Sequence, residues 1–235
     1  MLGCIRWQVP YGAWMMTDKD MQTAPIADED HRLIAILRGI TPQETEPVVK
    51  TLLAAGFTAI EVPLNSPDAF TSISIAASMV KNHLGADGLV GAGTVLSFED
   101  VALVQSAGGN VIVSPDCFAP VIEASITAGM HCFPGVFTAT EAHHALRSGA
   151  TGLKLFPASH LGPSGVKALK AILPADIALY AVGGVEAEDF AAYHKAGCFG
   201  IGIGSALYQP QISLRDLADN ANALMAMCRK VFYQD

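Results

Sequence analysis

The feature that most constrains the fold is a regular alternation that begins at residue 33. Short apolar runs rich in β-forming residues are each followed by turn residues and then by an amphipathic stretch. This pattern predicts parallel strands that are each followed by one helix and a return loop. Eight such runs occur, with first residues 19 to 31 positions apart, at residues 33–38, 58–62, 89–93, 111–114, 130–133, 152–156, 177–182 and 199–204.

Eight units of similar length favour a closed barrel, and we therefore predict an α/β fold, the (β/α)8 TIM barrel. The alternative is an open doubly wound sheet, which normally carries a glycine-rich fingerprint directly after its first strand. Here the first run is followed by Gly39-Ile40-Thr41-Pro42 instead. This difference favours the barrel over the open sheet.

Turn residues mark where the helices are expected to begin and end. Hydroxyl N-caps and early prolines are typical of helix starts, and three such sites occur, at Thr41-Pro42, Ser66-Pro67 and Ser97. Glycine is typical of the position just after a helix, and five helices are predicted to end at Gly56, Gly108, Gly129, Gly149 and Gly197.

The chain has 235 residues, which fits one barrel domain better than two domains. Residues 1–30 show neither helical nor strand periodicity, so we predict an N-terminal appendage there, disordered or the product of a start codon placed too far upstream. They lack the features of a secretory signal or a transit peptide. Residues 31–235 are predicted to form the barrel and a C-terminal helix.

Composition and charge exclude several classes of partner. The formal net charge is −8, and the 14 Lys and Arg residues are scattered, so no nucleic acid partner is expected. No apolar run is long enough to predict a membrane span. Five cysteines without a CxxC pair indicate reduced thiols and a cytoplasmic location rather than zinc or disulfides. The seven histidines carry no metal-ligand spacing, and His31 is predicted to lie at the surface.

Three charged residues fall inside the eight predicted strands: Arg38 in the first, Glu61 in the second and Lys154 in the sixth. A charge in a strand that is buried on both faces is costly unless it is paired or used. Catalytic residues of βα barrels gather at the carboxyl ends of the strands. We therefore expect the three side chains to converge on one cavity.

Lys154 is flanked by apolar residues, so its amine should be desolvated and neutral enough to attack a ketone as a Schiff-base lysine. Glu61 then suits general acid/base work beside an imine. The alternative is that the two form a buried salt bridge. Arg38 suits the binding of a substrate carboxylate, and its alternative role is to cap loop carbonyls at the end of the strand.

Three glycine-containing loops complete the expected site. Gly91-Ala92-Gly93-Thr94 follows the third run and allows a ligand to approach the backbone. Two further loops follow the seventh and eighth runs, where such barrels frequently hold a phosphate, and they contain Gly183-Gly184 and Gly202-Ile203-Gly204-Ser205. The alternative is that these glycines only relieve crowding in the barrel.

The sequence resembles the KDPG/KHG class I aldolases over about residues 33–210. The matching motifs occur in the family's order and are residues 33–40, Glu61-Val62-Pro63-Leu64-Asn65-Ser66-Pro67, residues 91–95, Lys154-Leu155-Phe156-Pro157 and residues 181–185. The resemblance implies an aldehyde-lyase that cleaves a small phosphorylated 2-keto-3-deoxy sugar acid to pyruvate and an aldehyde. It also implies a homotrimer that needs no cofactor and no metal.

The resemblance also implies a role for each matching residue. Lys154 would form the Schiff base and Glu61 would act as the general acid/base. The pyruvoyl end would contact Arg38, Thr94 and Pro115, with Phe156 lining the cavity. Phosphate would be held by Gly183, Gly184, Gly204 and Ser205.

Two positions bear on which epimer is the substrate. Members that act on the gluconate-derived epimer usually carry Arg where Asn65 stands and Thr where Val182 stands, whereas galactonate-type members match this sequence. The resemblance therefore implies galactonate-type specificity at Asn65 and Val182. Left open are a gluconate-type or broadly specific aldolase, a phosphate-binding barrel isomerase without covalent chemistry, and a sugar-phosphate sensor. Residues 1–30 and Asp116 depart from the family pattern.

Overall fold

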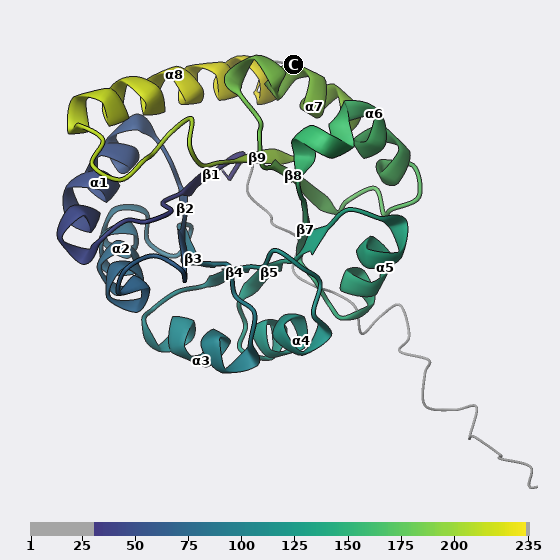
Figure 1. Ribbon diagram of the computed structural model, residues 1–235, viewed down its shortest axis with the longest axis horizontal. Coiled ribbons are helices and arrows are strands. Elements are labelled where there is room, and N and C mark those ends of the chain that lie inside the picture. Colours follow the sequence, from purple (N-terminus) through teal and green to yellow (C-terminus); the bar gives the residue numbers. More distant parts are fainter. Residues whose placement is uncertain (1–30, 234–235) are drawn as a thin grey trace, which may run out of the picture.

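The eight predicted runs form a ring of parallel strands with helices around the outside (Figure 1) in the computed structural model, which describes residues 31–233. The prediction for residues 1–30 therefore lies outside the described residues. The strands are β1 (Leu33–Ile36), β2 (Ala59–Pro63), β3 (Leu89–Gly93), β4 (Val111–Val113), β5 (His131–Phe133), β6 (Gly135–Val136), β7 (Gly152–Leu155), β8 (Ala178–Val182) and β9 (Gly200–Ile203).

Described residues 31–233 contain nine strands rather than eight because a short strand, β6, follows the fifth run after Pro134 and was not predicted. Proline has no N–H to donate to a ladder, but the Pro134 carbonyl still accepts a hydrogen bond from the Lys154 N–H at 2.9 Å. β5 pairs with β4 while β6 pairs with β7, so these two short strands close the sheet on itself. The predicted (β/α)8 barrel is confirmed.

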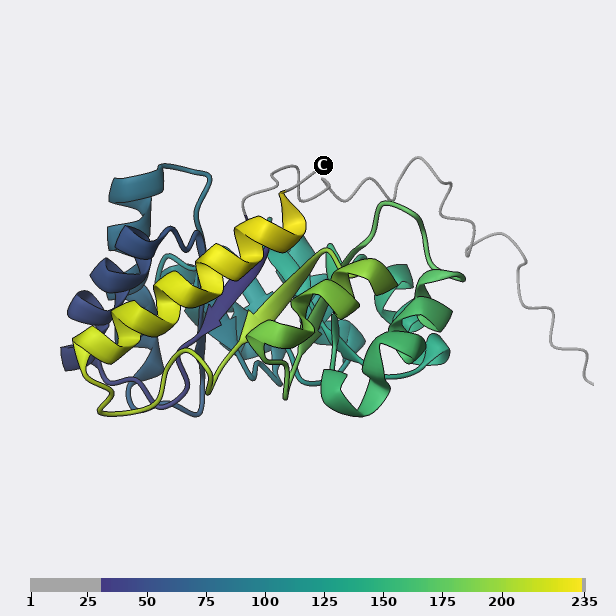
Figure 2. The same ribbon diagram turned by 90° about the horizontal axis from the view of Figure 1, so that it is seen from above.

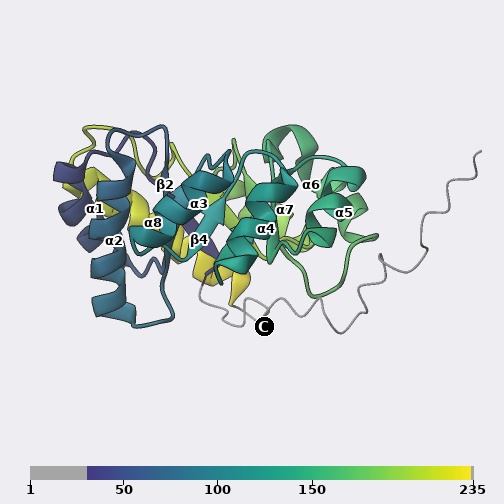
Figure 3. The ribbon, with the colours of Figure 1, turned by 90° about the horizontal axis from the view of Figure 1, so that it is seen from below.

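The helices lie outside the barrel in chain order. They are α1 (Pro42–Ala55), α2 (Ala69–Leu84), α3 (Phe98–Ser106), α4 (Ala119–Thr127), α5 (Ala139–Arg147), α6 (Ala158–Lys170), α7 (Phe190–Ala196), preceded by the short η1 (Ala187–Asp189), and α8 (Leu214–Phe232). Figure 2 shows α8 crossing the outside of the barrel between α1 and α7, and Figure 3 shows α3 and α4 on the opposite side. None of the helices within residues 31–233 has the length and apolar character needed to span a membrane.

Helix starts follow the predicted capping residues at two of three sites. α1 begins at Pro42, and α3 begins at Phe98 with the Ser97 hydroxyl accepting the Asp100 N–H at 3.2 Å. The third prediction is wrong: α2 begins at Ala69 rather than at Ser66-Pro67. The Ser66 hydroxyl instead bonds to another loop of the barrel, so it has no capping role in α2.

Apolar side chains fill two layers, one inside the barrel and one between the strands and the helices. In β1, Ile34 belongs to the inner cluster, while Leu33 and Ala35 belong to the outer one. Strands buried on both faces explain why the runs are continuously apolar rather than alternating. A charged side chain within such a strand must therefore enter one of two apolar layers.

The amino-terminal end of the barrel is closed by packed aromatic and basic side chains. The Arg32 guanidinium lies 4.0 Å from the Phe199 ring centroid, and its Nη1 donates to the Phe199 carbonyl at 3.0 Å. The Tyr180 hydroxyl donates to the His31 carbonyl at 3.1 Å. The prediction that His31 lies at the surface is wrong, because its side chain is buried with Nδ1 2.8 Å from the Thr58 hydroxyl.

Candidate active site

Glu61 and Lys154 approach each other from opposite walls of the barrel. Glu61 lies on β2 and Lys154 on β7, which stand across the ring from one another (Figure 1). Only 2% of the Glu61 surface and 5% of the Lys154 surface are exposed. The predicted pair of charges therefore lies deep in the molecule, where water contributes little to their solvation.

Burial shifts both groups toward their uncharged forms. Desolvation raises the pKa of Glu61, and the positive charges of Lys154 and Arg38 oppose this shift without reversing it. Desolvation also lowers the pKa of Lys154; Glu61 opposes that shift and Arg38 reinforces it. A stabilising ion pair would shift each pKa in the other direction. Burial therefore outweighs the mutual attraction of the two groups in both pKa shifts.

Two neighbours shape the space around these groups. The Lys154 Nζ lies 4.7 Å from the centroid of the Phe156 ring, which is 36% exposed. Gly93, the last residue of β3, lies directly against the Glu61 carboxylate, and a Cβ at this position would overlap it. Glycine at position 93 therefore leaves the Glu61 carboxylate the space that it occupies, and an apolar ring lies beside the amine.

Arg38 lies beyond the strand in which it was predicted. β1 ends at Ile36, and Arg38 is exposed in the following turn. Its Nη1 donates to the Asn65 Oδ1 at 2.9 Å. Its charge nevertheless affects the pKa of both Glu61 and Lys154, so the guanidinium lies within electrostatic reach of the two groups. The alternative role predicted for Arg38 is to cap loop carbonyls, whereas its hydrogen bond is to a side-chain amide.

Thr94 follows β3 in a strained conformation. Its φ of 57° lies in the left-handed region, which is a genuine outlier for a β-branched residue. Such strain costs about 1–3 kcal/mol and gathers at functional sites. The Val95 N–H donates to the Val113 carbonyl at 3.4 Å, which joins this loop to the β4 loop that contains half-buried Pro115. Both predicted pyruvoyl contacts thus lie at the carboxyl edge of the strands.

The four predicted phosphate residues leave adjacent strands at one edge. β8 and β9 pair with Val182 opposite Gly202, so the loops that follow them emerge together. Gly183 and Gly184 have φ values of 94° and 68°, a conformation that favours glycine.

The second of these loops forms a single helical turn. The Gly204 carbonyl accepts the Leu207 and Tyr208 N–H groups at 2.9 and 3.0 Å, which leaves exposed Ser205 at the head of the turn. A Cβ on Gly204 would meet no atom within 4 Å, so crowding does not explain glycine there.

Ser159 is a site residue that the sequence reasoning missed. Its N–H donates to the Gly183 carbonyl at 3.0 Å, and its side chain lies against Gly184. The next residue, His160, is exposed and lies with Nδ1 3.4 Å from the Ser159 hydroxyl. A serine in the first turn after a βα-barrel strand was the available signal.

The two candidate specificity residues lie at different depths. Val182 belongs to the cluster inside the barrel and is 6% exposed, with its side chain against Gly202. Asn65 is exposed on the loop after β2, bonded to Arg38. The structure therefore places Asn65 beside Arg38 on an exposed loop and Val182 in the inner layer of the barrel.

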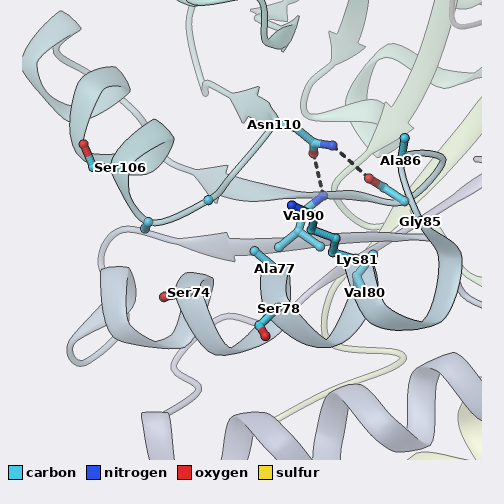
Figure 4. A pocket seen from close by; sticks show the side chains of 13 residues that line it. Ser74, Ala77, Ser78, Val80, Lys81, Gly85, Ala86, Val90, Ser106 and Asn110 are labelled. Carbon is cyan, nitrogen blue, oxygen red and sulfur yellow. Dashed lines mark hydrogen bonds between the residues drawn. The ribbon is translucent and has the colours of Figure 1, made fainter.

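A pocket of about 770 Å³ lies between α2 and α3, remote from these residues (Figure 4). It is at the amino-terminal end of β3 and β4, where the Asn110 side chain bonds the Val90 N–H and the Gly88 carbonyl, each at 2.8 Å. It shares no residue with the candidate active site. Its lining comprises Ser74, Ala77, Ser78, Val80, Lys81, Gly85, Ala86, Gly88, Val90, Ser106, Ala107, Gly108 and Asn110.

Among residues 31–233, no three His, Cys, Asp or Glu side chains gather closely enough to hold a metal ion. The fold and the site define a parallel βα barrel with a desolvated lysine and carboxylate at the carboxyl end of its strands. The model of a family described as "KDPG and KHG aldolase" matches residues 27–222. The chain belongs to this aldolase family.

Individual relatives agree with the family match. A protein of Rhizobium meliloti (strain 1021) named "Probable 2-dehydro-3-deoxy-6-phosphogalactonate aldolase" is 47% identical over 212 residues, 90% of this chain and 98% of the relative. The "2-dehydro-3-deoxy-6-phosphogalactonate aldolase" of Escherichia coli (strain K12) is 46% identical over 198 residues, 84% of this chain and 95% of the relative. A solved structure described as "Native KDPGal structure" superposes with a TM-score of 0.81 at 45% identity, covering 86% of this chain and 96% of that one.

Proposed function

We propose that this protein is a class I aldolase that cleaves 2-dehydro-3-deoxy-6-phospho-D-galactonate to pyruvate and D-glyceraldehyde 3-phosphate. Two relatives named for this galactonate substrate match nearly their whole length, which supports the choice of reaction. The observation that carries the chemistry is Lys154, buried inside the barrel with a lowered pKa beside a buried carboxylate. A desolvated amine of this kind is the nucleophile that a Schiff-base mechanism needs.

The reaction begins at the Lys154 amine. The neutral Nζ adds to the C2 ketone of the substrate, and loss of water from the resulting carbinolamine leaves a protonated imine. Burial favours this step because it raises the fraction of neutral amine at neutral pH. The iminium then withdraws electrons from the C3–C4 bond.

Glu61 moves the protons. Its carboxylate accepts the proton of the C4 hydroxyl as the C3–C4 bond breaks, which releases the aldehyde and leaves an enamine on Lys154. The protonated Glu61 then returns a proton to C3, and water hydrolyses the imine to pyruvate and free lysine. The raised pKa of Glu61 suits both directions of transfer near neutral pH.

The two ends of the substrate are assigned to two edges of the cavity. Arg38, Thr94 and Pro115 would hold the pyruvoyl carboxylate beside Lys154, and Phe156 would cover the imine. Phosphate would be bound by Gly183, Gly184, Gly204 and Ser205, on the loops after β8 and β9. Backbone N–H groups in such loops suit an anion even where cationic side chains are few.

Borohydride reduction in the presence of pyruvate, followed by peptide mass mapping, tests the proposal. We expect a reduced pyruvate adduct on Lys154 and none in Lys154→Ala. A folded protein that turns over the sugar acid phosphate without any adduct would overturn the Schiff-base mechanism. It would favour a barrel isomerase without covalent chemistry.

We further propose that the enzyme acts as a homotrimer in the cytoplasm. Apolar side chains are exposed on the loops and helix start that follow β3, β4 and β6, namely Leu96, Phe98, Phe118 and Phe137. Exposed apolar residues of this kind suit a subunit interface. The four described cysteines are free thiols, as in a reducing compartment. Light scattering during size-exclusion chromatography tests the trimer, and a monomeric mass would contradict it.

A further inference from the structure

The loops after β1 and β2 are joined by side chains where their backbone ladder ends. The last backbone bond between them runs from the Leu37 N–H to the Glu61 carbonyl at 2.9 Å. Beyond it, the Gly39 N–H donates to the Ser66 hydroxyl at 2.9 Å. The Arg38 Nη1 donates to the Asn65 Oδ1, also at 2.9 Å. Two consecutive residues of one loop thus hold two consecutive residues of the other.

Ser66 is a buried residue and its backbone is also hydrogen-bonded. Its side chain is buried, and its own N–H donates to the Pro63 carbonyl at 2.9 Å. Its partner Gly39 has a φ of 82°, and a Cβ there would approach the Pro210 Cγ to 2.9 Å. The backbone that carries Arg38 is therefore held between a buried hydroxyl and the loop that follows β9.

Arg38 needs such support because it is exposed and long. A free arginine side chain loses considerable rotamer entropy when it is ordered on a ligand. One bond from Nη1 to Asn65 restricts the guanidinium while leaving its other N–H donors available. Its charge also affects the pKa of Glu61 and Lys154, so it lies within electrostatic reach of both groups.

We propose that Asn65 and Ser66 are positioning residues that orient Arg38 for the carboxylate at the pyruvoyl end of the substrate. The inference rests on the proposed aldolase function and deepens it. Under this inference Asn65 does not recognise the configuration at C4. It orients the arginine that binds the pyruvoyl end, which is the same in both epimers. Loss of either side chain should therefore weaken binding of pyruvate itself.

Exchange of the pyruvate methyl protons with deuterated solvent tests this inference, because it uses Lys154, Glu61 and Arg38 without any aldehyde. We expect Asn65→Ala to raise the KM for pyruvate about tenfold, the usual effect of one hydrogen bond to a charged group, and Ser66→Ala to raise it less, because its bond to a backbone N–H joins neutral groups. The exchange kcat should change much less. The ratio of cleavage rates on the two epimers should stay the same.

Three further variants separate positioning from general damage. Ser66→Thr keeps the hydroxyl and should restore the KM, while Gln105→Ala removes one exposed side-chain bond on α3 and should change nothing. In an Arg38→Lys background, Asn65→Ala should add little, because the two changes act on one interaction. Full additivity in this cycle would overturn the inference.

The remaining outcomes distinguish failure of the proposed aldolase function from failure of the positioning role of Asn65 and Ser66. An unchanged pyruvate KM in Asn65→Ala, together with an altered epimer ratio, would make Asn65 a reader of C4 and overturn the positioning role. Absence of exchange in the wild-type protein would overturn the aldolase function first, and this inference with it. Exchange in the wild type with no KM change in either variant would overturn this inference alone.

Discussion

The two ends of the barrel bury similar side chains in opposite ways. At the amino-terminal end, Arg32 is stacked on Phe199 and bonded to its carbonyl, and the Tyr180 hydroxyl is bonded to the His31 carbonyl. At the carboxyl end, Lys154 lies beside the Phe156 ring and is buried with Glu61. A cation next to an aromatic ring therefore occurs at both ends.

The difference lies in what satisfies the polar groups. Backbone carbonyls accept from the Arg32 Nη1 and the Tyr180 hydroxyl, which closes the barrel, while the buried Arg32 Nε has no hydrogen-bond partner among the described residues. Burial instead shifts the pKa values of Lys154 and Glu61 toward their neutral forms, as the proposed mechanism requires. Both ends thus contain a basic side chain beside an aromatic ring. What differs is the partner of each buried polar group: a backbone carbonyl at the amino-terminal end, and another ionisable side chain at the carboxyl end.

Replacing Lys154 with Met tests the reactive end most severely. We expect turnover to fall by about 10⁴-fold or more, because the covalent nucleophile is lost. We expect the unfolding temperature to stay at or above that of the wild type, since an apolar side chain of similar length removes the desolvation cost of the amine. Steady-state cleavage assays and calorimetry measure the two effects. Turnover within tenfold of the wild type would show that Lys154 is structural, like Arg32.

Glu61→Gln should lower turnover by about 10²–10⁴-fold, the usual range for a general acid/base. The direction of its pH effect is a sharper test. The Glu61 negative charge raises the pKa of Lys154, so removing it should lower that pKa further. The pH profile of pyruvate trapping by borohydride should therefore move to lower pH in the variant. A profile that moves to higher pH would contradict the coupling.

Val182→Thr probes the cavity wall between the two ends. A hydroxyl placed inside the barrel beside Gly202 should change the preference between the two C4 epimers by about tenfold, toward the gluconate-derived one. Competition between the two substrates in one reaction measures this ratio directly. The pyruvate exchange rate is the control, and a change confined to that rate would remove Val182 from the specificity residues.

Tyr180→Phe should have the smallest effect on stability and activity of the four variants. It changes only the closed, amino-terminal end of the barrel. Loss of its bond to the His31 carbonyl should reduce the free energy of unfolding by about 1 kcal/mol. Catalytic constants should stay at wild-type values, because the hydroxyl lies at the far end of the barrel. Urea denaturation measures the loss, and a large fall in kcat would show that the two ends are coupled.

The sequence by itself predicted the barrel and pointed to the candidate reactive residues. The pattern of apolar residues is a property of neighbouring positions in the chain. The eight strand runs and most helix ends could therefore be predicted from the sequence alone. A charge such as Lys154 inside an apolar strand also stands out without any structure, because burial of an unused charge is costly. The resemblance to the family then indicated Asn65, Val182 and the phosphate loops as further candidate site residues.

Only the tertiary structure decided which of these residues touch. Ser66 was read as a helix cap, but its hydroxyl bonds Gly39 on another loop. Arg38 lies outside its strand and is held by Asn65, 27 residues away in sequence. Ser159 contacts Gly184 because the parallel strands place the loops that follow them at the same carboxyl edge of the sheet. Contacts of this kind depend on how the sheet closes, and local sequence patterns carry no information about closure.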